Sequence, residues 1–249
     1  MITIKEQFSY KLAKRGNKDE EYEDSYNFTT SHDHQNFKSA IADGATETSF
    51  AKEWANLLTN GFVQQDNSTE EEFANNLSSL REEWEFVVRS SNLTWFTQAK
   101  ASEGAFAAFL GIIVNLENKT LKYFAVGDCC LFIIRDSNLI VCEPIKSSTE
   151  FGKRPYLISS LKAKNHDIIS NIKTDIIQVQ NNDTIILMSD AIAQWYLTQY
   201  ENENNECPIL EESPKWIDTL RGSNAITNDD VTLIMLKVEE EDIDGVTKR

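Results

Sequence analysis

Six aspartates lie within two residues of an apolar run that is typical of a buried strand. They are Asp24, Asp43, Asp128, Asp190, Asp229 and Asp230. Carboxylates gathered at one edge of a buried sheet repel each other, and they relieve that repulsion by binding protons or hard cations. Because carboxylates offer only oxygen ligands, the cations that suit such a site are Mg²⁺ and Mn²⁺.

Two such cations would give an acidic protein a local positive site for phosphate. Metal pairs about 3.5–4 Å apart clamp a phosphoryl group and activate water. The alternative interpretation is local, because a single aspartate is more commonly a turn residue or a helix cap. Asp190, for example, could cap the helix that follows it. Periodicity alone does not bring these acids together in space.

The first forty residues predict three strands, at 3–12, 25–28 and 37–42. A polar stretch separates the last two and predicts a hairpin, whose open end would hold Asp24 beside Asp43. His32 and His34 belong to the turn end, roughly 15 Å away across five strand residues. We therefore interpret these histidines as exposed turn residues.

Two helices are predicted next. One helical face carries Phe50, Trp54, Leu58 and Phe62, and Ser68 with Glu71 has the spacing of a capping box before the second helix. The regular apolar stripe of that second helix indicates core packing.

From residue 105 the pattern changes to short strands with short polar connections, which predict an antiparallel meander. Residues 144–172 look irregular. Strands are expected again at 175–179, 184–188 and 231–238, with helices at about 190–200 and 213–221. The strands and helices are segregated, so an α+β fold with two packed sheets and outer helices is expected. We predict one domain over residues 1–240 and a charged tail at 241–249.

The formal net charge of −16 disfavours nucleic acid and anionic membranes as partners. The four cysteines lack metal-ligand and disulfide spacings, so free thiols in a reducing cytoplasm are expected. The sequence contains neither an apolar signal core nor a run long enough to span a membrane. These features predict a cytoplasmic location.

The ordered motifs resemble those of the metal-dependent Ser/Thr protein phosphatases of the type 2C class, in a divergent bacterial branch. They are YEDSYNF, AIADGA, GAFAAFLGIIV, LKYFAVGDCCLFIIR, IILMSDAIAQW and NDDVTLIML, spread over most of the chain. The resemblance implies a four-layer αββα sandwich of two antiparallel sheets flanked by helix pairs. It also implies a metal site at one end of the sandwich and a phosphorylated protein as substrate.

The resemblance implies two or three Mn²⁺ or Mg²⁺ ions. The residues that match the family's metal ligands are Glu23, Asp24, Asp43, Gly44, Asp128, Asp190 and Asp229. Asp43 matches the residue that bridges both metals, Gly44 would offer its carbonyl, and Asp128 matches a ligand of the third metal. Asp43, Asp190 and Asp229 would then form the catalytic core.

Four departures accompany the resemblance. Ala45 stands where many members have a His suggested as general acid, and Asp230 stands where they have Asn. Ser-Asp-Ala replaces the usual Ser-Asp-Gly. The position of the family's phosphate-binding arginine falls on Asp19, so Arg15, next to Lys14, is the candidate for that role. Two readings follow: a Mn²⁺/Mg²⁺-dependent phosphatase, or a pseudophosphatase that binds a partner without turnover. An acidic protein with coincidental motifs is a third and weaker reading.

Overall fold

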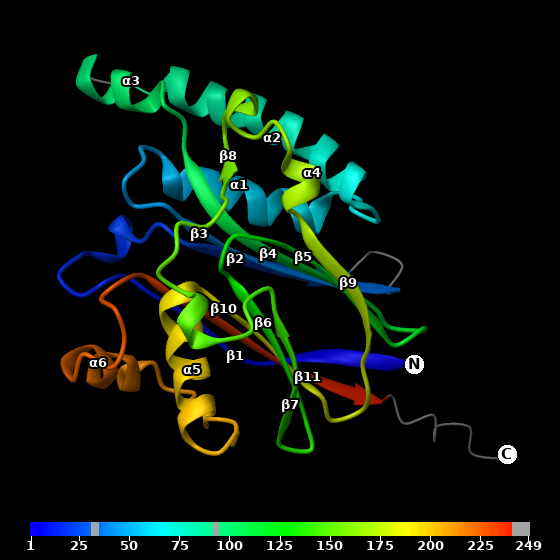
Figure 1. Ribbon diagram of the computed structural model, residues 1–249. Coiled ribbons are helices and arrows are strands. Elements are labelled where there is room, and N and C mark those ends of the chain that lie inside the picture. Colours follow the sequence, from blue (N-terminus) through cyan, green and yellow to red (C-terminus); the bar gives the residue numbers. More distant parts are fainter. Residues whose placement is uncertain (31–34, 92–94, 241–249) are drawn as a thin grey trace, which may run out of the picture.

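Two antiparallel β-sheets packed face to face form the centre of the molecule (Figure 1). The computed structural model describes residues 1–30, 35–91 and 95–240. The first sheet has the order β1 (Ile2–Leu12), β11 (Val231–Glu240), β10 (Thr184–Met188), β6 (Cys130–Arg135) and β7 (Asn138–Glu143). The second has the order β2 (Ser25–Thr30), β3 (Asn36–Gly44), β4 (Phe106–Asn115), β5 (Thr120–Val126) and β9 (Lys173–Gln178), with β8 (Ile158–Ser159) paired to β4.

Helices cover both outer faces of this sandwich (Figure 1). The second sheet carries α1 (Ala51–Gln64) and α2 (Glu70–Ser90), and the first carries α5 (Asp190–Asn202) and α6 (Lys215–Gly222). Two shorter helices are α3 (Trp95–Ala101) and α4 (Ile168–Asn171). The expected α+β fold, with two antiparallel sheets between helix pairs, is confirmed.

Three apolar layers follow from the alternation of side chains along the strands. Leu110, Ile112 and Leu187 are fully buried between the sheets. The opposite face of β4 presents Phe109 to Phe62 of α1, with ring centroids 5.4 Å apart. These layers hold the strand ends, and so the acids attached to them, in fixed positions.

Two predictions about local structure were wrong. The strands after residue 105 do not form one meander, because β4–β5 belong to the second sheet and β6–β7 to the first. The chain changes sheets at Gly127, whose φ of +96° suits glycine, and a short connection looks the same whether the strands pair or cross. The capping box before α2 uses Thr69 and Glu72, one residue later than predicted.

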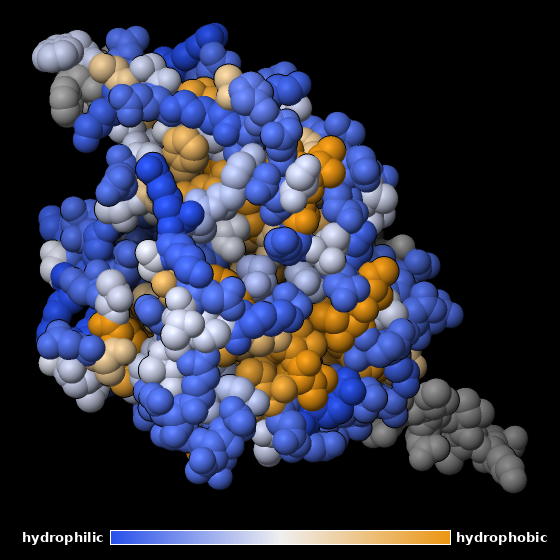
Figure 2. All heavy atoms as spheres, in the orientation of Figure 1, coloured by the Kyte–Doolittle hydropathy of each residue, from blue (hydrophilic) through white to orange (hydrophobic). Residues whose placement is uncertain are grey.

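The two histidines of the predicted turn and the predicted charged tail lie outside the described residues. All four cysteines are unpaired. In the described part of the chain, every helix is too short or too polar to cross a lipid bilayer. Figure 2 shows a largely hydrophilic face with an apolar area over the edge strands β7 and β9, where Ile140 and Ile176 are exposed.

Candidate metal and phosphate site

Strand pairing brings the predicted acids to one end of the sandwich. In the β2–β3 hairpin, Ser25 lies opposite Ala42, so Asp24 and Asp43 are neighbours as expected. In the other sheet the Ser189 N–H donates to the Thr232 carbonyl, which joins the end of β10 to the start of β11. Asp190 and Asp229 are thereby brought to the same end. The change of sheet at Gly127 adds Asp128.

Four of these aspartates line a single cavity of about 350 Å³. They are Asp43, Asp128, Asp190 and Asp229, and Gly44 and Ala45 line the cavity as well. The acids therefore meet although they are spread over nearly two hundred positions. Asp190 begins α5 beside the cavity, where its Oδ1 accepts the N–H of Ala191 at 2.6 Å, while Ser189 is the N-cap residue and makes no side-chain capping bond.

Asp24 does not line the cavity and is held by a chain of hydroxyl groups that crosses between the sheets. Thr232 of β11 donates its Oγ1 hydrogen to Asp24 Oδ2 at 2.7 Å. Since that hydrogen is used, the short contact between Tyr22 and Thr232 makes the Tyr22 hydroxyl the donor. Asp24 is 3% exposed and its Oδ1 has no partner, so one buried carboxylate oxygen is left to bind a proton or a cation.

Mutual repulsion is visible in the pKa values of the acids. Burial, followed by the charges of Asp24 and Asp190, raises the pKa of Asp43 well above its usual value. Burial and the Asp190 charge raise the pKa of Asp128 to about 7. Burial also raises the pKa of Asp190, with a further contribution from Asp229, while a side-chain hydrogen bond with Asp43 opposes the shift. The charges of these carboxyl groups therefore add to the effect of burial on one another's pKa.

Gly44 allows the two strands of the hairpin to approach closely at the site. A Cβ atom at this position would lie 2.5 Å from the carbonyl oxygen of Glu23. Any larger residue would push the backbone of Glu23 away from Asp43. Burial raises the pKa of the Glu23 carboxyl. The positive charge of the neighbouring Lys14 opposes this rise.

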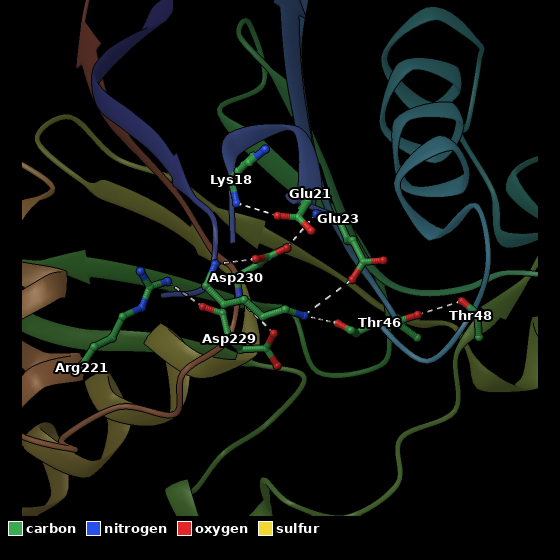
Figure 3. Close-up of polar contacts among 10 residues, drawn as sticks. Lys18, Glu21, Glu23, Thr46, Thr48, Arg221, Asp229 and Asp230 are labelled. Carbon is green, nitrogen blue, oxygen red and sulfur yellow. Dashed lines mark hydrogen bonds and ion pairs between the residues drawn. The ribbon is translucent and has the colours of Figure 1, made fainter. Parts of the chain in front are cut away.

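Asp230 supports the site through the backbone instead of facing the cavity (Figure 3). Its two carboxylate oxygens accept the N–H groups of Lys14 at 2.8 Å and Glu23 at 2.7 Å. An asparagine could accept only one of these, since its second terminal atom is a donor. The departure at this position therefore matches the local hydrogen bonding.

Arg221 of α6 is a supporting residue that the sequence analysis missed. It is 6% exposed and donates to the carbonyl oxygens of Ala13 at 3.0 Å and Asp229 at 2.6 Å. Figure 3 shows its guanidinium approaching the backbone of Asp229. This contact connects the end of β1 to the turn that carries Asp229. No local sequence pattern predicts it.

Of the two neighbouring cations, Lys14 reaches toward the site. Its Nζ donates to Thr46 Oγ1 at 3.0 Å and lies 3.8 Å from Glu23 Oε2. Arg15 is exposed, and its backbone groups pair with the side chain of Asn228. Burial lowers the pKa of Arg221, and the nearby Arg15 charge adds to that shift.

The donor set fits hard divalent cations. Over the described ranges, no three carboxylate, imidazole or thiol side chains lie close enough together to hold a metal ion as placed. The cavity acids nevertheless offer only oxygen donors and raise one another's pKa. Asp24, whose charge acts on Asp43, adds the unpartnered Oδ1 from outside the cavity lining. Ala45 has no group to donate a proton, and its carbonyl accepts from Thr48.

Comparison by sequence found no matching family model and no matching curated protein. Comparison of structures found clear similarities. The Ser/Thr phosphatase Stp1 from Staphylococcus aureus superposes with a TM-score of 0.62 at 14% identity, covering 96% of both chains. The catalytic domain of the Ser/Thr phosphatase PstP, in complex with two manganese ions, gives 0.61 at 15% identity over 96% of this chain and 100% of that one.

The photosystem II phosphatase PBCP gives a TM-score of 0.57 at 14% identity and covers 95% of this chain and 98% of that chain. The similarity therefore extends over nearly the whole length of each chain compared. At these identities the comparison establishes the fold. The two antiparallel sheets and outer helices of this chain have the arrangement found in the type 2C Ser/Thr protein phosphatases, so this chain has that fold.

Proposed function

We propose that this protein is a divalent-metal-dependent phosphomonoesterase that acts on phosphoserine or phosphothreonine in proteins. The observation that carries the proposal is the cavity of about 350 Å³, which four aspartates line in a fold shared with phosphatases. Buried acids that lie close together destabilise a protein unless protons or cations neutralise them, and their oxygen atoms are suitable ligands for hard divalent cations.

Asp43, Asp190 and Asp229 would form the core of a Mn²⁺ or Mg²⁺ site, with Asp24, Asp128, Glu23 and the Gly44 carbonyl around it. When bound, paired ions activate water and neutralise phosphate charge. Asp24 is oriented for this task by Thr232, and Asp43 by its contact with Asp190. The electrostatic cost of gathering these acids would be offset by the cations.

The phosphate would be steadied by a cation from the segment after β1. Lys14 is our preferred candidate because its Nζ lies between Thr46 and Glu23. Arg15 stays the alternative, since an arginine binds phosphate with two parallel hydrogen bonds. Ala45 offers no acid for the departing alcohol, so aryl phosphates with good leaving groups should react faster than phosphoserine.

The second candidate is a pseudophosphatase that binds a phosphorylated partner without turnover. Ala45 motivates it, whereas the retained carboxylates speak against it, because a surface that only binds has no need of buried unpaired acids. A cytoplasmic location and the absence of nucleic-acid and membrane partners stay predictions from the charge and the cysteines.

One experiment separates these possibilities. Hydrolysis of p-nitrophenyl phosphate is measured with Mn²⁺, with Mg²⁺ and with EDTA, for the wild type, Asp43→Asn and Asp190→Asn. Circular dichroism confirms that each variant is folded. We expect turnover that requires metal and is lost in both variants. A folded wild type with no turnover under any metal condition would support the pseudophosphatase, and turnover that persists in EDTA would overturn the metal-dependent mechanism.

A further inference from the structure

A second cavity of about 760 Å³ opens beside the candidate metal site. The two cavities share the lining residues Ala45, Thr46, Glu47, Pro155 and Leu157. Three segments line the second cavity: residues 45–49 before α1, residues 99–106 from the end of α3 into β4, and the connection 154–165. We call this cavity the side groove. The shared lining residues place the side groove directly beside the site, and Ala45 contributes only a methyl group where the two adjoin.

The side groove combines an apolar floor with exposed cations. Phe106, Tyr156 and Leu157 supply the apolar part. Lys164 lies over the Phe106 ring, with its Nζ 5.7 Å from the ring centroid, and Arg154 is exposed at the wall. Glu47 and Glu103 also line the groove, as does Lys100, so cations exceed acids by one. This excess stands out in a chain with a net charge of −16.

A third cavity next to the metal site has the reverse balance of charge. Its volume is about 410 Å³, and it shares Thr46 with the site and the side groove. Its charged lining residues are Lys14, Glu20, Glu21, Glu23, Lys52 and Glu53, so acids exceed cations by two. A phosphopeptide that runs from the metal site along the side groove would therefore meet more cations than acids, whereas along the third cavity it would meet more acids than cations. This difference favours acidic peptide residues in the side groove.

The wall of the side groove is fixed before any ligand arrives. Asn165 is 4% exposed, and its amide donates to Tyr156 Oη at 3.1 Å and to the Leu157 carbonyl at 2.9 Å. Its Oδ1 accepts the N–H of Ser159 and an N–H of Arg81. Since Tyr156 accepts this bond, its own hydroxyl hydrogen is available to a ligand. Preorganisation of this kind lowers the entropic cost of binding.

We propose that the side groove binds the residues on one side of the phosphorylated residue, and that it selects an acidic residue beside Arg154 and Lys164 and an apolar residue on the Phe106–Tyr156–Leu157 floor. The proposal rests on the proposed function, because it takes the phosphate to lie in the neighbouring metal cavity. It goes further by naming the substrate class: phosphoproteins with acidic and apolar residues on one flank of the phosphorylated residue.

The test measures binding, so that it does not depend on turnover. Fluorescent peptides carry a phosphonate that resists hydrolysis in place of phosphoserine. One peptide has aspartate and leucine before the phosphonate, a second has them after it, and a third has lysine on both sides. Dissociation constants are measured by fluorescence anisotropy with Mg²⁺, for the wild type, for Arg154→Glu/Lys164→Glu and for Lys173→Glu. Lys173 is an exposed cation of β9 and does not line the groove.

We expect the wild type to bind one of the two acidic peptides about tenfold more tightly than the lysine peptide, equivalent to about 1.4 kcal/mol. The double variant should lose or reverse this ratio, and Lys173→Glu should keep it. Equal binding of all three peptides, no binding at all, or an unchanged ratio in a folded double variant would overturn the groove. Hydrolysis of p-nitrophenyl phosphate is measured in parallel, so a failure of the catalytic proposal is recognised separately.

Discussion

Replacing Gly44 by alanine tests the close approach of the two hairpin strands at the site. The added Cβ would lie 2.5 Å from the Glu23 carbonyl oxygen and 3.1 Å from two atoms of Ala51. Non-bonded heavy atoms prefer a separation of about 3.5 Å, so the backbone must move by on the order of 1 Å. Backbone oxygen cannot rotate away as a flexible side chain can, so the strain falls on β3 and the residues before β2.

Overpacking of this kind costs about 1–3 kcal/mol, and backbone involvement favours the upper end of that range. In a chain of this length each kcal/mol lowers the unfolding temperature by roughly 2–4 °C, so Gly44→Ala should lower it by about 6–12 °C. Glu23 and Asp43 would move relative to each other. A displacement near 1 Å can reduce turnover by about 100-fold.

Gly222 provides a matched control. It ends α6, is exposed, and has no atom within 4 Å of a Cβ added there. Alanine is a better helix former, so Gly222→Ala should raise stability by no more than about 1 kcal/mol. Both variants are compared by thermal unfolding in EDTA and by Mn²⁺-dependent hydrolysis of p-nitrophenyl phosphate. Wild-type stability and turnover in Gly44→Ala would show that the predicted collision at Glu23 does not occur.

Asp230→Asn places an amide donor against one of two backbone N–H groups, and at saturating Mg²⁺ we expect a loss of about 2 kcal/mol in urea unfolding. An unchanged unfolding free energy would contradict the bridging role of Asp230. Lys14→Ala should raise KM for p-nitrophenyl phosphate by about tenfold and Arg15→Ala by less than about twofold; the reverse order would assign the phosphate contact to Arg15. Burial raises the pKa of Asp128 from its ordinary value of 3.8 to about 7. The associated stability is therefore fully present below 3.8 and is lost as pH rises through 7, so in EDTA the unfolding temperature should fall between about pH 4 and pH 7. A flat profile would contradict the gathering of carboxylates.

Features encoded by neighbouring residues were predictable from the sequence. The ends of apolar runs located the strand ends, and the hairpin alone placed Asp24 beside Asp43. The sheet to which each later strand belongs could not be read from periodicity, because a turn that joins paired strands resembles one that crosses between sheets. The turn at Gly127 is such a crossing between sheets. Because periodicity did not identify it, the position of Asp128 near the other acids could be inferred only from the family resemblance.

The supporting contacts had no signal in the sequence. Asp230 binds backbone groups more than 200 positions away, and Arg221 does the same at the end of β1. Asn165 fixes the wall of the side groove through hydrogen bonds that depend on loop geometry. Lys14 and Arg15 are adjacent in an irregular segment, so strand parity could not decide which of them reaches the site.

The hydroxyl chain from Tyr22 through Thr232 to Asp24 joins the two sheets at the same end where their carboxylates repel. Asp24 and Asp43 belong to one sheet, and Asp190 and Asp229 flank strands of the other. Without metal, repulsion between these carboxylates therefore acts to separate the two sheets at this end. Away from this end, the apolar side chains buried between the sheets hold the two sheets together. Opening of the sandwich should therefore start at the candidate metal site. A cation bound there would stabilise the contact between the two sheets as well as take part in the reaction.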